Sequence, residues 1–319
     1  MKSNKSRLGL GTAAIGRPHY INVRQEEAAE FEMGPFREQG IAVLDEAFKN
    51  GITYYDTAPG YGMAEQLIMA WLAGKQAGSI ELANKWGYRY VANFRKSAEV
   101  HEIKEHSLEN LNAQWLKSQK LLPNMKVYQI HSATFETGVL ENEPILNRLA
   151  ELKDSHGLKI GLTSSGTNQV ELMKRALDVE VGGTALFDVF QFTYNVFEQN
   201  FADLAIDLVR DNKSVVIKEA MANGRVFPSS KFAHYQPAYS YMTELAQKYG
   251  VGNDAIALRF CMDTIPGSTV LSGAGIKEHL VSNLLALKFE LAQEEIERLK
   301  QFAVSSESYW GERKKLAWN

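Results

Sequence analysis

Four residues of this chain have side-chain types and spacing that suit proton transfer to an oxygen atom. Asp56 and Tyr61 lie five residues apart in DTAPGYG, Lys85 lies in ANKWG, and His131 lies in VYQIHS. Tyrosine has a pKa near ~10, so it is a poor acid at neutral pH unless a cation stabilises its phenolate. Lys85 could be that cation, held by Asp56, while His131 hydrogen-bonds a substrate oxygen. The set predicts proton donation to a carbonyl oxygen as a cofactor delivers hydride.

These residues stand at or near the ends of short apolar runs, which alternate with longer amphipathic stretches. The runs predict strands at residues 8–11, 52–56, 80–85, 127–131, 158–163, 188–192, 214–218 and 269–272. The stretches predict helices at residues 38–49, 64–74, 99–118, 143–155, 168–178, 200–211, 253–262 and 277–287. Runs such as ITYYD and VVIK are apolar on both faces, as buried parallel strands are. The alternation predicts a single (β/α)8 TIM barrel over residues 1–319, with an open doubly wound sheet as the alternative.

In a barrel, the carboxyl ends of the strands share one face, and active sites lie there. Asp56, Lys85 and His131 would end three neighbouring strands, and Tyr61 would follow in the first loop. Each residue alone has a simpler explanation, such as a helix cap for Asp56 or loop packing for Tyr61. Because all four residues fall at or near strand ends, we favour a single active site at that end of the barrel.

Two irregular segments and the chain end are predicted to overhang the same face. Residues 17–33 form an extended loop after the first strand, and residues 225–238 follow the seventh. The tail at 305–319 is rich in aromatic residues. The side chains predicted to line a substrate pocket are Trp86, Tyr20, Tyr309 and Trp310. Plain barrel packing is the alternative for Trp86.

Composition excludes several classes of function. The 319 residues are 45% hydrophobic and 23% charged, with a net charge of −3, so we expect no general attraction to nucleic acid or to an anionic membrane. No apolar run approaches the ~20 residues of a membrane span, and the first residues lack a signal-peptide pattern. The single cysteine, Cys261, lies in the apolar pattern AIALRFCMD and is predicted to be a packed thiol. A reducing, cytoplasmic setting is expected.

Two motifs are set aside as coincidental. GLGTAA at residues 9–14 matches a dinucleotide-binding fingerprint, but Gly16 and Pro18 follow too soon for the helix that would cradle a pyrophosphate. HEIKEH at residues 101–106 resembles a zinc motif, yet its histidines are five residues apart and would point ~140° apart on a helix. We expect this stretch to be a solvated helix face and expect no metal site.

Over nearly its full length the chain resembles the aldo-keto reductase superfamily. The likeness is carried by LGLGTAAIG, GITYYDTAPGYGMAEQLI, ANKWG and VYQIHS, and later by LKIGLTSSG, FDVFQFTYNVFE and VLSGAGIKEHLVSNLLAL. The resemblance implies an enzyme that interconverts a small carbonyl and its alcohol with a nicotinamide cofactor, NADPH first and NAD as the alternative. It also implies a catalytic tetrad of Asp56, Tyr61, Lys85 and His131, with Tyr61 as general acid.

The same resemblance implies a set of cofactor-binding positions. Gln191 matches a glutamine that binds the nicotinamide carboxamide, and Thr163 and Ser164 fall where the family commonly has a Ser-Asn pair with that role. On the adenosine side, the matching positions are Gly273, Lys277, His279 and Asn283.

The chain also departs from the family pattern. Lys218 stands near the position where many members have an aromatic residue that stacks on the nicotinamide. In the phosphate turn, only Lys277 and His279 offer positive charge to a 2′-phosphate, which favours bidentate or multiple cationic donors. Two other functions remain open: a cofactor-sensing regulatory subunit like the potassium-channel β subunits, and a Schiff-base enzyme that uses Lys85.

Overall fold

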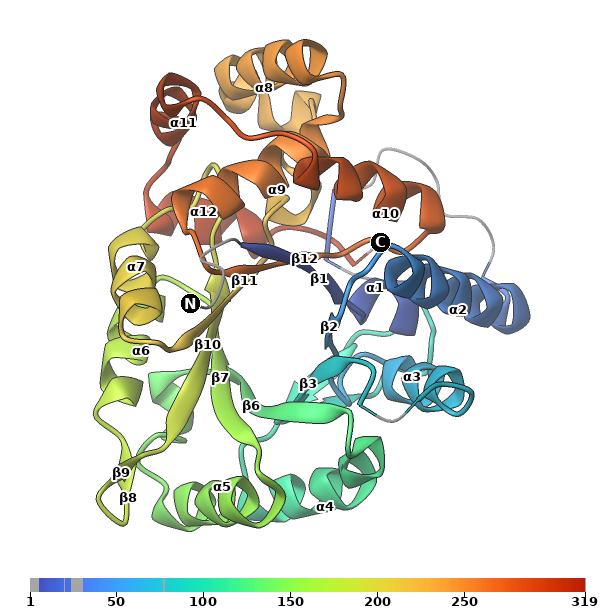
Figure 1. The fold of residues 1–319 in the computed structure, drawn as a ribbon, viewed down its shortest axis with the longest axis vertical. Helices are drawn as coiled ribbons and strands as arrows, with labels where there is room; N and C mark the ends of the chain where they lie inside the picture. The colour runs from blue at the N-terminus through green and yellow to red at the C-terminus, as the bar shows by residue number, and fades with distance from the viewer. Residues whose placement is uncertain (1–5, 20, 24–30, 77, 319) are drawn as a thin grey trace.

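The computed structural model describes residues 6–19, 21–23, 31–76 and 78–318, so Tyr20 lies outside the described residues. Eight parallel strands form a closed barrel (Figure 1). In chain order they are β1 (Arg7–Gly11), β2 (Tyr54–Asp56), β3 (Glu81–Trp86), β6 (Met125–Ala133), β7 (Lys159–Ser164), β10 (Phe187–Thr193), β11 (Ser214–Lys218) and β12 (Thr269–Ser272). Each strand pairs with its neighbour in the chain, and β12 closes the barrel against β1. The predicted barrel is confirmed.

Helices surround the barrel on the outside, as Figure 1 shows. They are α1 (Ala13–Gly16), α2 (Met33–Lys49), α3 (Ala64–Leu72), α4 (Leu108–Ser118), α5 (Glu143–His156), α6 (Gln169–Leu177), α7 (Ala202–Arg210), α8 (Gln236–Tyr249), α9 (Asn253–Thr264), α10 (Lys277–Leu284), α11 (Gln293–Lys300) and α12 (Ser306–Arg313). Among the described residues, no helix is long and apolar enough to cross a membrane.

The helix α5 illustrates how local sequence defines an element. Asn142 caps its start, because the side-chain oxygen accepts a hydrogen bond from the Ile145 amide at 3.3 Å. Gly157 ends it in a left-handed conformation with φ of 63°, which glycine adopts without steric cost. Ile145, Leu149 and Leu152 are buried at helical spacing, so this face packs toward β7.

The barrel interior has an apolar layer beneath a polar one. Tyr54, Ala83, Val127, Val189, Val216 and Leu271 form one buried cluster. Five of these residues stand two positions before a polar residue on the same strand: Asp56, Lys85, Gln129, Gln191 and Lys218. Because side chains alternate along a strand, the polar residues lie on the same inner face, one layer nearer the carboxyl ends. The fold thereby assembles a polar mouth.

The helix predicted at residues 99–118 is wrong in its first part. Residues 102–104 form the strand β5 (Glu102–Lys104), which pairs antiparallel with β4 (Tyr88–Tyr90). The helix α4 starts only after Ser107, whose hydroxyl caps it by accepting from the Asn110 amide at 3.1 Å. HEIKEH is therefore no solvated helix face: His101 is only 7% exposed, and its neighbours pair as a ribbon.

Two further boundaries differ from the prediction, and the helices α1, α8, α11 and α12 lie where no helix was predicted. The helix predicted to start at residue 38 begins at Met33. The segment predicted to be irregular at 225–238 contains the 3-10 turn η4 (Ser230–Tyr235) and ends inside α8. Pro237 suits the start of α8, because its fixed φ fits the first helical turn, where its missing amide hydrogen has no cost.

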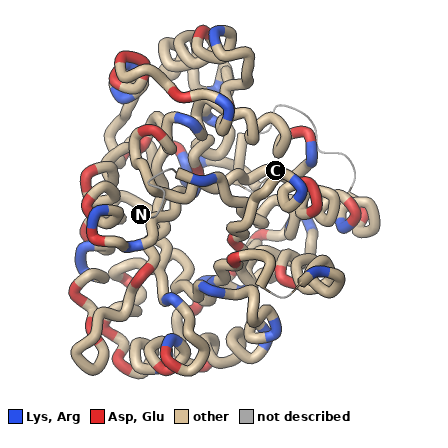
Figure 2. The backbone as a smooth tube through the Cα atoms, viewed as in Figure 1, with Lys and Arg blue, Asp and Glu red and all other residues tan. Residues whose placement is uncertain are grey.

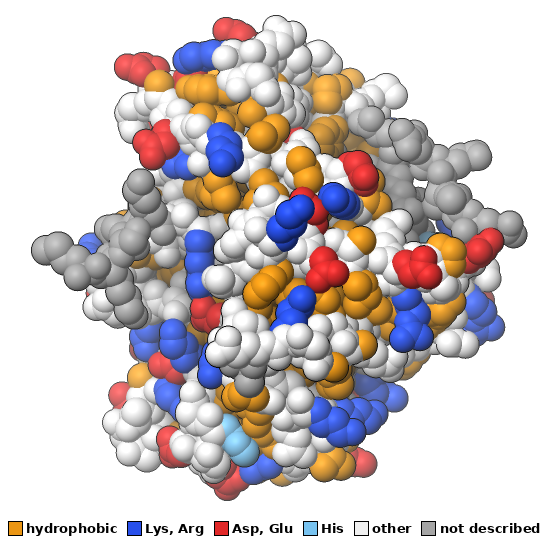
Figure 3. All heavy atoms as spheres, turned by 45° about the vertical axis from the view of Figure 1, so that its right-hand side comes forward, with side chains coloured by type: hydrophobic (Ala, Val, Ile, Leu, Met, Phe, Trp, Pro, Cys, Tyr) orange, Lys and Arg blue, Asp and Glu red, His pale blue; other side chains and the backbone are white. Residues whose placement is uncertain are grey.

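Charged residues of both signs are spread over the outer helices (Figure 2). On the face shown in Figure 3, positive and negative side chains are interspersed among apolar ones. The small antiparallel pair β8 (Glu180–Val181) and β9 (Thr184–Ala185) lies outside the barrel sheet. Cys261 is buried in α9, as predicted, and burial raises the pKa of its thiol above the usual range.

Candidate active site

Asp56 and Lys85 form a buried ion pair inside the barrel mouth. The Lys85 ammonium contacts Asp56 Oδ1 and donates to the Thr57 carbonyl at 3.2 Å. The other Asp56 oxygen accepts from Gln191 Nε2 at 2.8 Å and from Gln129 Nε2 at 3.4 Å. Because three side chains hold the carboxylate, the ammonium is fixed in direction. Such pairing also suits an ammonium better than the free amine that a Schiff base requires.

Tyr61 lies at the mouth between two cations and an imidazole. Its hydroxyl is 3.5 Å from His131 Nε2, and its ring centroid is 4.9 Å from Lys85 Nζ and 5.3 Å from Arg17 Cζ. Burial raises the pKa of the Tyr61 phenol well above its usual range, and the Asp56 carboxylate raises it further, while Arg17 lowers it. The phenol therefore keeps its proton in the resting site, and the lowering of its pKa expected from Lys85 is outweighed there by burial and the Asp56 carboxylate.

The imidazole of His131 is held in a neutral state. Burial lowers the pKa of His131 well below its usual range, and the positive charges of Lys85, Arg17 and Lys218 lower it further. A neutral imidazole can donate one hydrogen bond without adding charge to the site. The residue lies where the register between β6 and β7 shifts, and Ser132 beside it has a positive φ of 49°. Such irregularities re-aim side chains near active sites.

The loop that carries Tyr61 is fixed against α1. The Met63 amide donates to the Gly16 carbonyl at 2.8 Å, and the Tyr61 amide donates to the Ala58 carbonyl at 3.0 Å. A methyl group on Gly16 would meet the Tyr61 carbonyl oxygen at 2.1 Å. Only glycine allows this approach, so α1 sets the position of the phenol.

The residues predicted to hold the nicotinamide meet on neighbouring strands. Gln191 of β10 is the register partner of Thr163 on β7, and both are buried. The Thr163 hydroxyl accepts from the Ser132 amide at 2.7 Å. Ser164 Oγ is buried and has no hydrogen-bond partner among the described residues. A buried hydroxyl without a partner, one residue after Thr163, fits a carboxamide, which both donates and accepts.

Lys218 reaches into the same region from β11. Its ammonium donates to Thr193 Oγ1 at 2.8 Å and to Ser165 Oγ at 3.0 Å, while Glu219 Oε1 lies 4.0 Å away. Burial lowers the pKa of Lys218 to about 8. Burial acts to raise the pKa of Glu219, but the charges of Arg313 and Lys218 outweigh it and bring that pKa to about 2.

The predicted adenosine-side residues lie just after β12 and along α10. Asn283 is buried, accepts from Ser272 Oγ at 2.6 Å and donates to Asp254 Oδ2 at 2.6 Å. Lys277 pairs with Glu46 Oε2 at 3.0 Å. The remaining members, Gly273 and His279, are exposed.

The residues predicted to line a substrate pocket are buried where they are described. Trp86 is fully buried, and the centre of its ring lies 5.5 Å from the centre of the His106 ring. Tyr309 is fully buried, and its hydroxyl accepts from Asn195 Nδ2 at 2.9 Å; Trp310 is 4% exposed. These contacts are packing contacts, and the structure does not bring Tyr309 or Trp310 into contact with the tetrad.

Sequence reasoning missed Arg17 and Trp318. Arg17 is buried, and its Nη1 lies 2.6 Å from Glu102 Oε2. Its Cζ lies 4.9 Å from the centre of the Trp318 ring and 5.3 Å from that of Tyr61. The Trp318 ring also stacks on His101 at 4.4 Å. No local pattern signals such contacts, because they join the two ends of the chain. Gln129 was also missed, although its place two residues before His131 is a detectable signal.

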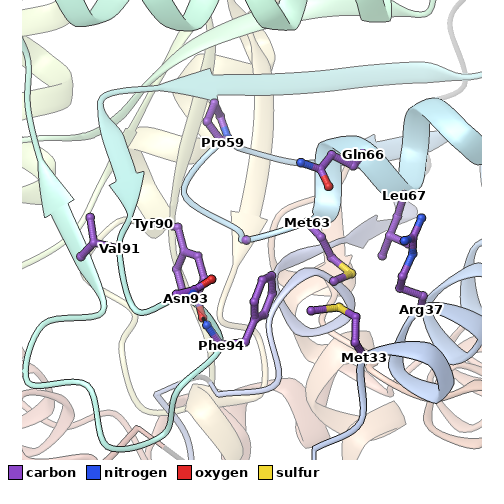
Figure 4. Close-up of a pocket in the computed structure, with 11 residues that line it drawn as sticks. Met33, Arg37, Pro59, Met63, Gln66, Leu67, Tyr90, Val91, Asn93 and Phe94 are labelled. Carbon is purple, nitrogen blue, oxygen red and sulfur yellow. Dashed lines mark hydrogen bonds between the residues drawn. The ribbon is translucent and has the colours of Figure 1, made fainter.

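A separate cavity of about 450 Å³ lies behind the loop that carries Tyr61 (Figure 4). Pro59 and Met63 of that loop, Met33 of α2, Tyr90 of β4 and Phe94 after it contribute to the wall of this cavity. None of the tetrad residues lines it.

A closed parallel barrel whose strand ends carry a buried acid–lysine pair, a phenol and a neutral imidazole defines a class of barrel enzymes with acid–base chemistry at the mouth. Comparison with known proteins identifies the family. The sequence model of the Aldo/keto reductase family matches residues 7–304, so the chain belongs to the aldo/keto reductase family. This is a family of NAD(P)-dependent oxidoreductases that act on small carbonyl substrates.

Individual relatives are distant but cover most of the chain. The chain is 23% identical over 300 residues to aldo-keto reductase YhdN of Bacillus subtilis, covering 84% of this chain and 81% of that protein. It is 22% identical over 318 residues to norsolorinic acid reductase B of Dothistroma septosporum, covering 92% of this chain and 77% of that protein.

Solved structures share the fold, and two of them serve as examples. One is the glycerol dehydrogenase of Gluconobacter oxydans, with a TM-score of 0.68, 20% identity, and coverage of 93% of this chain and 91% of that one. The other is an aldo-keto reductase of Bacillus halodurans in its holo form, with a TM-score of 0.66, 18% identity, and coverage of 94% and 93%.

Proposed function

We propose that this chain reduces an aldehyde or ketone to the alcohol, or catalyses the reverse reaction, with Tyr61 as the general acid or base. The observation that carries the proposal is the contact of the Tyr61 hydroxyl with His131 Nε2 at 3.5 Å, with the Lys85–Asp56 pair against the phenol ring. A carbonyl oxygen placed beside these two groups would accept a hydrogen bond from each of them.

The residues divide the work at that oxygen. Neutral His131 holds the carbonyl oxygen with an N–H hydrogen bond and orients its carbon. Tyr61 gives its proton to the same oxygen as negative charge develops there. The Lys85 ammonium stabilises the phenolate that remains, and Asp56 keeps the ammonium in place. A bound nicotinamide cofactor supplies the hydride.

The cofactor would lie across the mouth. Gln191, Thr163 and Ser164 would hold the carboxamide, and the unpartnered Ser164 hydroxyl supports this assignment. Gly273, Lys277, His279 and Asn283 would hold the adenosine side. NADPH is our first expectation and NADH the alternative, since Lys277 is already paired with Glu46 and would have to change partner to bind a 2′-phosphate.

Replacing Tyr61 by phenylalanine tests the proposal, because it removes the hydroxyl and keeps the ring. We expect turnover of simple aldehydes to fall by about 10²–10⁴-fold, the usual contribution of a general acid. The dissociation constant for the cofactor should change little. Turnover is followed by NADPH and NADH absorbance, and cofactor binding by fluorescence titration.

Tyr88→Phe is the matched control, since the Tyr88 ring also contacts His131, at 4.7 Å. Its turnover should stay within a few-fold of wild type. Equal turnover in Tyr61→Phe and wild type would refute the role of Tyr61. A wild-type protein that binds cofactor but turns over no aldehyde or ketone would favour the cofactor-sensing alternative.

A further inference from the structure

Within the described part of the chain, no carboxylate oxygen lies closer than 4.0 Å to the ammonium of Lys218. Two of its ammonium hydrogens point to neutral hydroxyls, those of Thr193 and Ser165. Among the described residues, Glu219 alone places a carboxylate within 4.0 Å of it. That carboxylate is committed elsewhere, because Arg313 Nε donates to both of its oxygens at 3.0 Å. The site therefore contains a positive charge that the surrounding protein balances only in part.

The other charges that face Lys218 cancel in pairs. Glu219, from the end of β11, pairs with Arg313 of α12. Lys85 of β3 pairs with Asp56 of β2. His131, which feels the charge of Lys218 as well, is held neutral by its lowered pKa. Of the charges that the described residues place in this part of the mouth, the ammonium of Lys218 is the one left without a full partner.

The position of Lys218 connects it to the nicotinamide site. Lys218 is the register partner of Thr193, two residues beyond Gln191 on β10. Its second acceptor, Ser165, follows Ser164 directly. A ring whose carboxamide is bound by Gln191 and Ser164 would therefore lie beside the Lys218 ammonium.

We propose that Lys218 makes the site discriminate between the oxidation states of the cofactor, binding the reduced form more tightly than the oxidised form. The oxidised nicotinamide ring carries a positive charge and the reduced ring carries none, so a largely buried cation repels only the oxidised ring. An enzyme built this way loads reduced cofactor from a mixed pool and releases oxidised cofactor readily after turnover. The inference rests on the proposed function, because it needs a nicotinamide in the mouth.

Equilibrium binding to the whole chain tests the inference without any turnover. Dissociation constants for NADPH, NADP+, NADH and NAD+ are measured by titration calorimetry for wild type, Lys218→Met and Lys218→Arg. The readout is the ratio of the oxidised to the reduced constant for each cofactor pair, in which the contribution of a 2′-phosphate cancels. We expect Lys218→Met to lower this ratio about tenfold, as loss of one partly screened like-charge contact would. Lys218→Arg should preserve the ratio.

Lys213→Met is the matched control. Lys213 immediately precedes β11, at the end of the strand opposite to Lys218, and donates to the Phe187 carbonyl at 2.8 Å. Its removal should leave the ratio unchanged. An unchanged ratio in a folded Lys218→Met would overturn the inference.

Wild-type protein alone gives an independent measurement if Lys218→Met does not fold. With a pKa of about 8, Lys218 loses its charge as the pH rises, so the ratio should fall between about pH 6.5 and 9.5. A ratio that stays constant over this range would contradict the inference. If wild type binds none of the four nucleotides, the proposed function fails together with it; binding with no discrimination defeats the inference alone.

Discussion

At the scale of single residues, the mouth holds a lysine whose charge works against folding. Burial lowers the pKa of Lys218 to about 8, whereas a lysine in an unfolded chain titrates near ~10.4. Between these pH values the unfolded chain binds the additional proton, so the free energy of unfolding rises with pH. Below about pH 6.5 the largely buried ammonium is fully charged and its destabilising effect is complete.

Replacing Lys218 by methionine should therefore stabilise the protein near neutral pH. We expect the free energy of unfolding to rise by about 1–3 kcal/mol at pH ~7, because a shift of one pKa unit corresponds to ~1.4 kcal/mol. The gap between variant and wild type should narrow as the pH rises toward ~10. Urea denaturation at both pH values measures it. A variant less stable than wild type at pH ~7 would show that the Thr193 and Ser165 hydrogen bonds outweigh the burial cost.

At the scale of elements, the short helix α1 decides where the catalytic loop lies. Gly16 at its end touches the loop so closely that a Cβ atom would fall 2.1 Å from the Tyr61 carbonyl oxygen and 2.6 Å from the Ala64 Cβ. Neither atom is the far end of a flexible side chain. The loop or the helix α3 must shift to admit the methyl group.

Gly16→Ala should thus lower stability and turnover together. Overpacking of this kind costs about 1–3 kcal/mol, and displacement of the Tyr61 loop misplaces the phenol. Gly34→Ala is the control, since a Cβ on Gly34 in α2 meets nothing within 4 Å. Chemical denaturation and aldehyde turnover are measured on both variants. A Gly16→Ala protein with wild-type stability and turnover would refute the role of α1.

Some elements of the fold can be predicted from the sequence and others cannot. The strands and the placement of Asp56, Lys85 and His131 at or near their ends were predictable, because each depends on a local run of apolar residues. The ribbon at residues 102–104 was not, since Ile103 is 41% exposed and its pairing with β4 leaves no periodicity over three residues. The sequence identified Lys218 only as a departure from the family pattern. Its hydroxyl partners, Thr193 and Ser165, come from other strands or their ends, so only the folded barrel shows them.

At the scale of the whole molecule, distant parts of the chain meet at the mouth. Arg17 lies over Tyr61, pairs with Glu102 of the ribbon, and contacts Trp318 near the chain end. The predicted overhang by the tail is consistent with these contacts, although Trp318 rather than Tyr309 reaches Arg17. Contacts across 300 residues of sequence follow from barrel closure and have no local signal.

The apolar layer of the barrel interior supports stability, and the polar layer above it carries the candidate catalytic residues. A substitution at Val189 tests whether these two roles are separate. Val189 is 1% exposed in the apolar layer, two residues before Gln191. Val189→Ala should lower the free energy of unfolding by about 1–3 kcal/mol, since it deletes buried methyl groups from a closed barrel that relaxes little. Turnover should stay within about twofold, because the polar layer keeps its own hydrogen bonds to Asp56.

Val100→Ala, at a position 54% exposed, is the control and should change the free energy of unfolding by less than about 0.5 kcal/mol. If Val189→Ala lost turnover as steeply as Tyr61→Phe while remaining folded, the apolar layer would have to position the catalytic residues and not merely support them.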